Sequence, residues 1–172
     1  MRVGSSLSNE FDSINHSFQM YSLENSYSIK DLIDWEIRIK KKIGVENISY
    51  CCELKLDGVS VSLSYKNGNF VQGLTRGDGV TGDNVTENLK TINTIPLKIK
   101  NDLDFDIRGE VVIEKNDFNK LNQDRLSLGE QPYMNPRNTA SGSIKLIKSE
   151  EVKKRPLKCY SFQVVGDKLP FK

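Results

Sequence analysis

Residues 59–71 combine a strict alternation of side chains with a two-residue turn, and few folds accommodate both. The alternating positions are Val59, Val61, Leu63 and Tyr65, separated by Ser60, Ser62 and Ser64. This period is typical of a β-strand, in which successive side chains point to opposite faces. Asn67-Gly68 suits a type I′ turn, so the chain is expected to return through Phe70 and Val71 as a hairpin. The fold must therefore contain an antiparallel sheet.

The rest of the chain alternates between strand and helix signals. Strands are expected at 48–54, 105–113 and 157–165, and helices at 28–44, 85–91 and 115–128. A Gly- and Asp-rich loop is expected at 76–83, and a basic segment of small residues at 135–146. We predict an α+β fold of antiparallel sheets with flanking helices, in which residues 1–27 are a lead-in segment and residues 28–172 form the main body.

The helix expected at 28–44 has recognisable ends. Ser28 is a suitable N-cap with Asp31 three residues later, and Gly44 is a suitable stop. Lysines at positions 40–42 fall in its last turn, where the helix dipole favours cations. A solvated helix end explains these lysines most simply, and a DNA-contacting face is the alternative.

Composition excludes several classes of protein. Net charge is +2, from 25 Lys+Arg against 23 Asp+Glu, which neither requires nor excludes nucleic acid. The 3 cysteines form no CxxC pair and there is 1 histidine, which argues against a disulfide scaffold or a Cys/His metal site. No apolar run approaches the roughly 20 residues that span a bilayer. We expect a cytoplasmic protein, with no membrane association and no obligate protein partner indicated.

Lys55 is the residue with the strongest chemical signal. It is expected at the end of the 48–54 strand, between Glu53 and Asp57, which would share its face if the strand continued. Gly58 allows the backbone to turn immediately afterwards. A lysine attacks phosphorus only as the neutral amine, so a nearby cation must offset these carboxylates. By itself the Lys-Leu-Asp-Gly pattern fits an ordinary charge cluster at a strand end better than it fits catalysis.

Seven blocks, in order, extend this signal over nearly the whole chain. They are MYSLEN at 20–25, CELKLDG at 52–58, TRGDGVTGD at 75–83, VTEN at 85–88, RGEV at 108–111, NPRN at 135–138 and KRPL at 154–157. Together they resemble the adenylation domain of bacterial NAD-dependent DNA ligases. The KLDG element is shared with other covalent nucleotidyltransferases, whereas the glycine-acid block and NPRN are more specific.

The resemblance implies a nucleotidyltransferase core of the DNA ligase type and a three-step reaction. Lys55 would attack the α-phosphorus of NAD and hold AMP as a phosphoramidate. AMP would then pass to the 5′-phosphate of a nick in double-stranded DNA, and the 3′-hydroxyl would displace it, in replication and repair. Charge on the phosphoryl oxygens calls for cations, and Mg²⁺ fits this need. Its protein ligands are not identified, and zinc is expected only in a C-terminal part of the family that this chain lacks.

The same resemblance assigns roles to individual residues. Lys55 and Asp57 would be catalytic, with Asp57 helping in orientation or metal binding. The nucleotide-binding positions would be Ser22 and Leu23 in the pocket, Glu53 at the adenine, and Arg76 and Glu110 near the ribose and phosphate. The fork of donors on Arg76 suits a phosphate or ribose clamp. Glycines 77, 79 and 82 are expected to serve backbone geometry.

Arg137 and Lys145 are candidates for DNA contact. They lie in a segment of Asn, Ser and Gly residues that can bring backbone donors close to a phosphate. The family often has arginine at position 145, so Lys145 keeps the charge and loses bidentate bonding. Simple surface charges are the alternative for both residues.

The chain is short for a complete enzyme of this family. The N-terminal domain that recognises nicotinamide mononucleotide, the later lysine-bearing core segments and the C-terminal modules are all expected to be missing. We therefore expect at most feeble self-adenylylation and no nick sealing. Sealing of a nicked duplex by the purified chain, followed on a denaturing gel, would contradict this expectation.

Two other functions compete with an NAD-dependent ligase. One is a covalent nucleotidyltransferase that uses ATP, which labelled NAD and ATP would separate. The other is a noncatalytic remnant that binds nucleotide or DNA without turnover, for which Lys55→Ala would change no detectable activity. The MYSLEN, TRGDGVTGD and NPRN blocks favour NAD.

Overall fold

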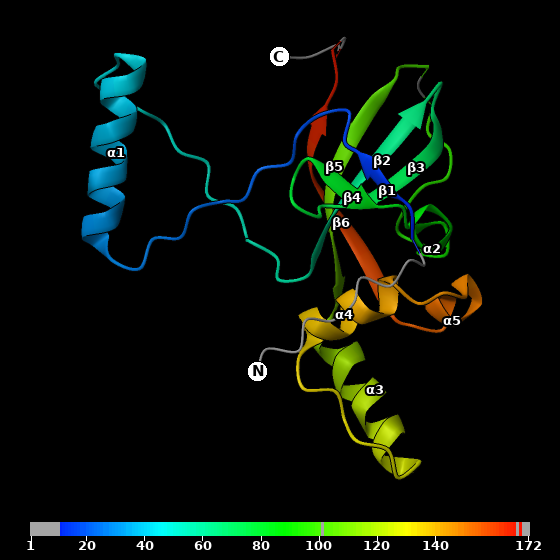
Figure 1. The fold of residues 1–172 in the computed structure, drawn as a ribbon. Helices are drawn as coiled ribbons and strands as arrows, with labels where there is room; N and C mark the ends of the chain where they lie inside the picture. The colour runs from blue at the N-terminus through cyan, green and yellow to red at the C-terminus, as the bar shows by residue number, and fades with distance from the viewer. Residues whose placement is uncertain (1–10, 101, 168, 170–172) are drawn as a thin grey trace, which may run out of the picture. The chain divides into compact units, whose positions relative to one another are not determined.

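The chain, seen here in a computed structural model, is described at residues 11–100, 102–167 and 169. Its contacts fall into two compact units (Figure 1). The first comprises the chain up to Met20 together with the chain from Leu56 onward, and the second comprises Tyr21–Lys55. Each unit has its own architecture and is described separately.

A four-stranded antiparallel sheet forms the centre of the first unit. Its strands are β2 (Val59–Lys66), β3 (Asn69–Thr75), β5 (Phe105–Ile113) and β6 (Leu157–Val165), in the order β3-β2-β5-β6 (Figure 1). The turn between β2 and β3 has positive φ angles at Asn67 (48°) and Gly68 (71°), as a type I′ turn requires. The predicted hairpin and the strands at 105–113 and 157–165 are confirmed.

Helices cover one face and one end of this sheet. They are α2 (Thr86–Leu89), α3 (Lys115–Ser127), α4 (Pro136–Ile144) and α5 (Ser149–Lys153). Figure 1 shows α4 and α5 beside one end of the sheet, with α3 projecting beyond it. The core joins alternate residues of β2 and β5 to α2, α4 and α5 and includes Val61, Leu63, Leu89, Val111, Ile144 and Val152. Helix α2 is shorter than predicted, and the basic segment at 135–146 proves to be mostly helix.

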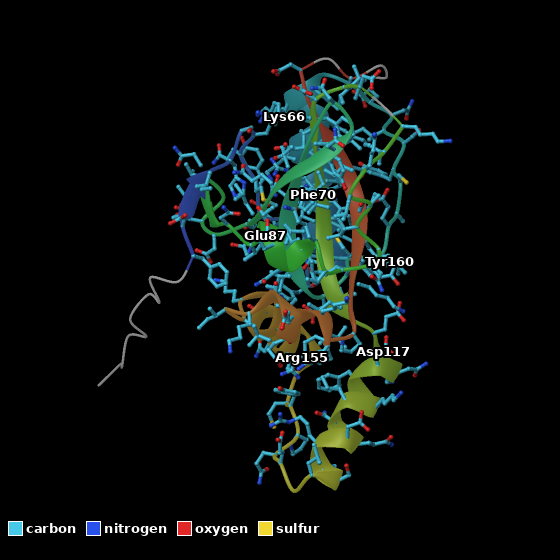
Figure 2. All side chains as sticks on the ribbon, turned by 90° about the vertical axis from the view of Figure 1, so that its right-hand side faces the viewer. Lys66, Phe70, Glu87, Asp117, Arg155 and Tyr160 are labelled. Atoms are coloured by element: carbon cyan, nitrogen blue, oxygen red, sulfur yellow. The ribbon has the colours of Figure 1, made fainter. Side chains whose placement is uncertain are left out.

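Helix α3 is held at its start by charged side chains. Lys158 Nζ lies 2.6 Å from Glu114 Oε2 and 3.8 Å from Asp117 Oδ2. The Tyr160 hydroxyl also donates to Glu114, and these two hydrogen bonds lower the pKa of the Glu114 carboxyl. Figure 2 shows Lys66 toward one end of the sheet and Asp117, on α3, beyond the other. The sheet is thus linked to α3 where β5 ends.

A second, smaller sheet pairs β1 (Ser13–Asn15) with β4 (Thr81–Asp83). Neither strand was predicted, because each is three residues long and carries no alternation of its own. The loop expected at 76–83 therefore ends in a strand. Residues distant in sequence meet here, which local patterns do not reveal.

The second unit is built on helix α1 (Ile29–Ile43), and its predicted ends are confirmed. Ser28 Oγ accepts from Asp31 N, and Asp31 in turn accepts from Ser28 N, as a capping box. Gly44 ends the helix in the left-handed conformation at φ 71°. Trp35 packs on Tyr50 with ring centroids 5.7 Å apart, which folds the following segment back onto the helix.

The strand expected at 48–54 is absent: the described residues 45–57 contain neither helix nor strand. The segment has β-prone residues, but a strand is stabilised by a neighbouring strand, and this segment belongs to neither sheet. The expectation that Lys55 ends a strand, with Glu53 and Asp57 on one shared face, is therefore wrong. Lys55 lies in a segment that is neither helix nor strand.

Antiparallel sheets with flanking helices agree with the predicted α+β class. Among the described residues, no helix is both long enough and apolar enough to cross a membrane.

We predict that Leu63→Ala lowers the free energy of unfolding by about 2–5 kcal/mol, because removing a buried leucine side chain leaves a cavity. Leu63 is 2% exposed within the core. Urea unfolding followed by circular dichroism measures the change. Leu97→Ala, at a position that is 52% exposed, is the matched control. Equal loss in both variants would contradict the assigned core.

Candidate functional site

Hydrogen bonds link the loop that carries Arg76 to residues 16–20. His16 N donates to Val80 O and Met20 N donates to Gly79 O, each at 2.9 Å. The His16 ring nitrogen Nε2 lies 3.1 Å from Arg76 O. Together with the β1–β4 pairing, these contacts fix the backbone of the loop on both sides.

Glycines 77 and 79 shape this loop. Both have positive φ angles, 56° and 94°. A Cβ on Gly77 would lie 1.9 Å from Thr81 O, and one on Gly79 would lie 2.3 Å from Met20 O. Any side chain at either position would therefore clash with backbone. The predicted role of these glycines in backbone geometry is confirmed.

Asp78 completes the loop. Its Oδ1 accepts from Thr81 N at 2.7 Å and from Val80 N at 2.9 Å. These backbone donors lower the pKa of the Asp78 carboxyl, because they bind the ionised form. The Asp78 carboxylate therefore stabilises the backbone of this loop. Arg76, at the start of the loop, is half-buried.

Glu110 connects β5 to the start of β2. Its Oε2 accepts from Ser60 Oγ at 2.6 Å and its Oε1 accepts from Gly58 N at 3.1 Å. Gly58 is itself buried, and a Cβ there would lie 2.2 Å from Val111 O. Arg76 N donates to Ser60 O at 2.9 Å. The backbone of Arg76 and the side chain of Glu110, both predicted as nucleotide contacts, therefore bond to the same residue of β2, Ser60.

Arg108 is a functional candidate that sequence reasoning missed. Strand alternation places it with Asp106 and Glu110 on the face of β5 away from the core, opposite Ser62 of β2. It is 3% exposed, and its Nη2 donates to Phe18 O. Burial lowers the pKa of the guanidinium and the charge of Asp106 opposes that effect. The sequence signal that could have indicated a buried Arg108 was its position within the strand predicted at 105–113.

The two cations proposed for DNA contact each have a carboxylate partner. Arg137 Nη1 lies 3.1 Å from Asp57 Oδ1, and Lys145 Nζ lies 2.5 Å from Asp83 Oδ2. All four side chains are at least one-third exposed. Helix α4 supports both cations: Asn135 caps its start and Lys145 follows its end. Since exposed ion pairs contribute little stability, these cations are available to exchange partners.

The predicted site residues are divided between the two units. Asp57, Arg76, Glu110, Arg137 and Lys145 lie in the first. The second contains Ser22, Leu23, Glu53 and Lys55, all exposed. Within the second unit, Cys51 Sγ lies 3.9 Å from Glu53 Oε1. Among the described residues, no group of three or more His, Cys, Asp or Glu is arranged to hold a metal ion.

We predict that Glu110→Ala lowers the free energy of unfolding by about 1–3 kcal/mol, because Gly58 N and Ser60 Oγ lose their acceptor. Thermal unfolding followed by circular dichroism measures this. Glu87→Ala on α2 is the control, since Glu87 pairs with Lys90 on an exposed surface (Figure 2). A change no larger for Glu110→Ala than for Glu87→Ala would show that the link is unimportant.

The chain is similar to known DNA ligases. Proteins named DNA ligase from Flavobacterium johnsoniae, Flavobacterium psychrophilum and Staphylococcus saprophyticus are 57%, 52% and 47% identical to it. The alignments cover 99%, 99% and 95% of this chain. They cover 26%, 26% and 24% of the relatives, so the chain spans about a quarter of their length.

The family model for the NAD-dependent DNA ligase adenylation domain matches residues 8–171. That range includes the whole second unit, most of the first unit and all the predicted site residues. The seven sequence blocks, the relatives and the family match agree, and the chain belongs to the NAD-dependent DNA ligase adenylation-domain family.

Proposed function

We propose that this chain contributes the nucleotide-attacking lysine of an NAD-dependent DNA ligase. Lys55 lies in Lys-Leu-Asp-Gly within the matched range 8–171, and this observation carries the proposal. The neutral amine attacks the α-phosphorus of NAD, a P–N bond forms, and nicotinamide mononucleotide leaves with the electrons of the broken P–O bond. AMP then passes to the 5′-phosphate of a DNA nick, and the 3′-hydroxyl expels it to seal the strand.

Two residues of the first unit are proposed to hold the nucleotide. Arg76 presents a fork of donors suited to the ribose and phosphate region. Its backbone is bonded to Ser60, and Glu110 accepts from the Ser60 hydroxyl. A binding residue positions its ligand well only when its own backbone is fixed, and the contacts of His16 and Asp78 supply that support.

Three residues of the second unit are proposed to line the nucleotide pocket. Ser22 and Leu23 follow the segment that ends at Met20, and Glu53 precedes Lys55 by two positions. All three are exposed and open to a ligand. We propose that the chain is part of a nucleotidyltransferase core, with residues 1–27 as the lead-in segment and 28–172 as a partial adenylation domain.

Mg²⁺ is the proposed metal. It usually keeps several waters and binds one or two carboxylates together with substrate phosphates. The lack of a dedicated cluster among the described residues is compatible with that mode. Asp57 is the carboxylate that we propose for it. When bound, Mg²⁺ supplies positive charge to the phosphoryl oxygens.

Nicked double-stranded DNA is the proposed second substrate. Arg137 lies in the first turn of helix α4 and Lys145 directly follows the helix. Phosphate groups would replace the carboxylates of Asp57 and Asp83 as their partners. The reaction would belong to DNA replication and repair in the cytoplasm.

We predict that NAD labelled in its adenylyl group transfers weak but detectable label to Lys55 in the presence of Mg²⁺. Peptide mapping by mass spectrometry measures the position, and a phosphoramidate is identified by its stability to alkali and lability to acid. Lys55→Arg should abolish the label, because the guanidinium is not a nucleophile near neutral pH. Lys66→Arg, on β2, is the matched control and should keep it.

Three results would count against this proposal. Label that survives in Lys55→Arg would place the chemistry elsewhere. Label from ATP in preference to NAD would indicate the ATP-dependent class. Absence of any label at Lys55 would leave the noncatalytic nucleotide- or DNA-binding function as the better description of this chain.

A further inference from the structure

Two consecutive thiols precede the proposed nucleophile. Cys51 and Cys52 are free and exposed, in the same unit as Lys55. They lie in a segment without helix or strand, where neighbouring residues such as Leu54 are also exposed. The reaction proposed above uses neither thiol.

The third cysteine provides an internal contrast. Cys159 is buried on β6, and burial raises the pKa of its thiol to about 12. Thiol–disulfide exchange requires the thiolate and access of the reagent, and both are denied at Cys159. Reactivity toward a dissolved disulfide should therefore be confined to positions 51 and 52.

Adjacency also determines the product of such a reaction. Consecutive Cα atoms are about 3.8 Å apart across a trans peptide, whereas disulfides usually need about 4.4–6.8 Å. A disulfide between Cys51 and Cys52 would be strained. The second thiol is therefore a poor resolving group, unlike the partner in a CxxC pair, and a mixed disulfide with a small thiol should persist until an external thiol removes it.

We propose that Cys51-Cys52 is a modification site for small thiol disulfides that controls access to Lys55. One cysteine thiolate attacks a sulfur of glutathione disulfide, a new S–S bond forms, and one glutathione leaves as the thiolate. That thiolate takes up the proton which the cysteine lost. The cysteine is oxidised to the mixed disulfide, and half of the glutathione disulfide is reduced.

A glutathionyl group on Cys52 is long enough to reach Lys55. Lys55 follows Cys52 by three residues, so their Cα atoms are at most about 10–11 Å apart. A glutathionyl group is a flexible tripeptide of similar length. It carries two carboxylates and one ammonium, so it adds net negative charge beside the lysine, which would repel the phosphates of a nucleotide. Both shielding and charge oppose attack by the amine on a nucleotide, so the regulatory consequence rests on the function proposed for Lys55.

The experiment maps the adduct first. The purified chain is treated with glutathione disulfide and analysed as intact protein and as peptides by mass spectrometry. We expect one glutathionyl group per chain, on Cys51 or Cys52, with Cys159 unmodified and full reversal by dithiothreitol. The double variant Cys51→Ser/Cys52→Ser should show no adduct, and Cys159→Ser should react like the unaltered chain.

Three mapping results would overturn the proposal. They are no adduct at positions 51 and 52, equal modification of Cys159, or conversion of the pair to an internal disulfide.

The second measurement tests the effect on Lys55 without any nucleotide. The modified and unmodified chains are acetylated with a limiting N-hydroxysuccinimide ester, and the acetylated fractions of Lys55 and Lys66 are compared. We expect a several-fold loss of acetylation at Lys55 in the glutathionylated chain and no change at Lys66, which belongs to the other unit. Equal acetylation of Lys55 in both samples would overturn the proposed control of access.

These outcomes are separable from the proposed ligase function. Failure of NAD to label Lys55 would remove that function and leave the thiol map and the amine reactivity unaffected. Conversely, labelling of Lys55 together with a failed thiol map would retain the ligase function and remove the modification site.

Discussion

The antiparallel pairing of β2 with β3 on one side and β5 on the other governs the first unit. It turns alternate residues of β2 to opposite faces, so Val61 and Leu63 enter the core while Ser60 and Ser62 face the polar side. The polar side is where Glu110 reaches both Ser60 and Gly58. A one-residue slip of this register would exchange the two faces, turning the serines into the apolar core and separating Glu110 from its donors.

Elements with a strong local signal could be predicted closely. The hairpin followed from the alternation and from Asn67-Gly68, and the ends of α1 followed from Ser28 and Gly44. The prediction of a strand at 48–54 was wrong because β-prone residues form a strand only beside another strand. Strand β1 was missed for the complementary reason: three unremarkable residues are extended because β4 lies beside them. Pairing between distant segments is a tertiary property that no local pattern contains.

The residues of the candidate site also divide into those predicted from sequence and those found only in the structure. The identity of Lys55, Arg76 and Glu110 came from blocks of sequence, and the resemblance to a family was necessary because Lys-Leu-Asp-Gly alone is ambiguous. The residues that hold the backbone around these side chains were found only in the structure. Arg108, which donates to Phe18 O, and His16, against the backbone of Arg76, gain these contacts only when distant segments meet.

The partner of Asp57 bears on the chemistry of the lysine two positions before it. Near neutral pH, removing the proton from a free lysine amine costs about 4–5 kcal/mol. The ion pair with Arg137 offsets the charge of Asp57, the carboxylate that follows Lys55 by two positions. An exposed ion pair is worth at most about 1 kcal/mol, so this pairing offsets a minor part of the cost. In the proposed reaction, the rest of the cost would be offset by cations that arrive with the substrate or by burial of the amine when the nucleotide binds. Attack by Lys55 would then depend on a filled site.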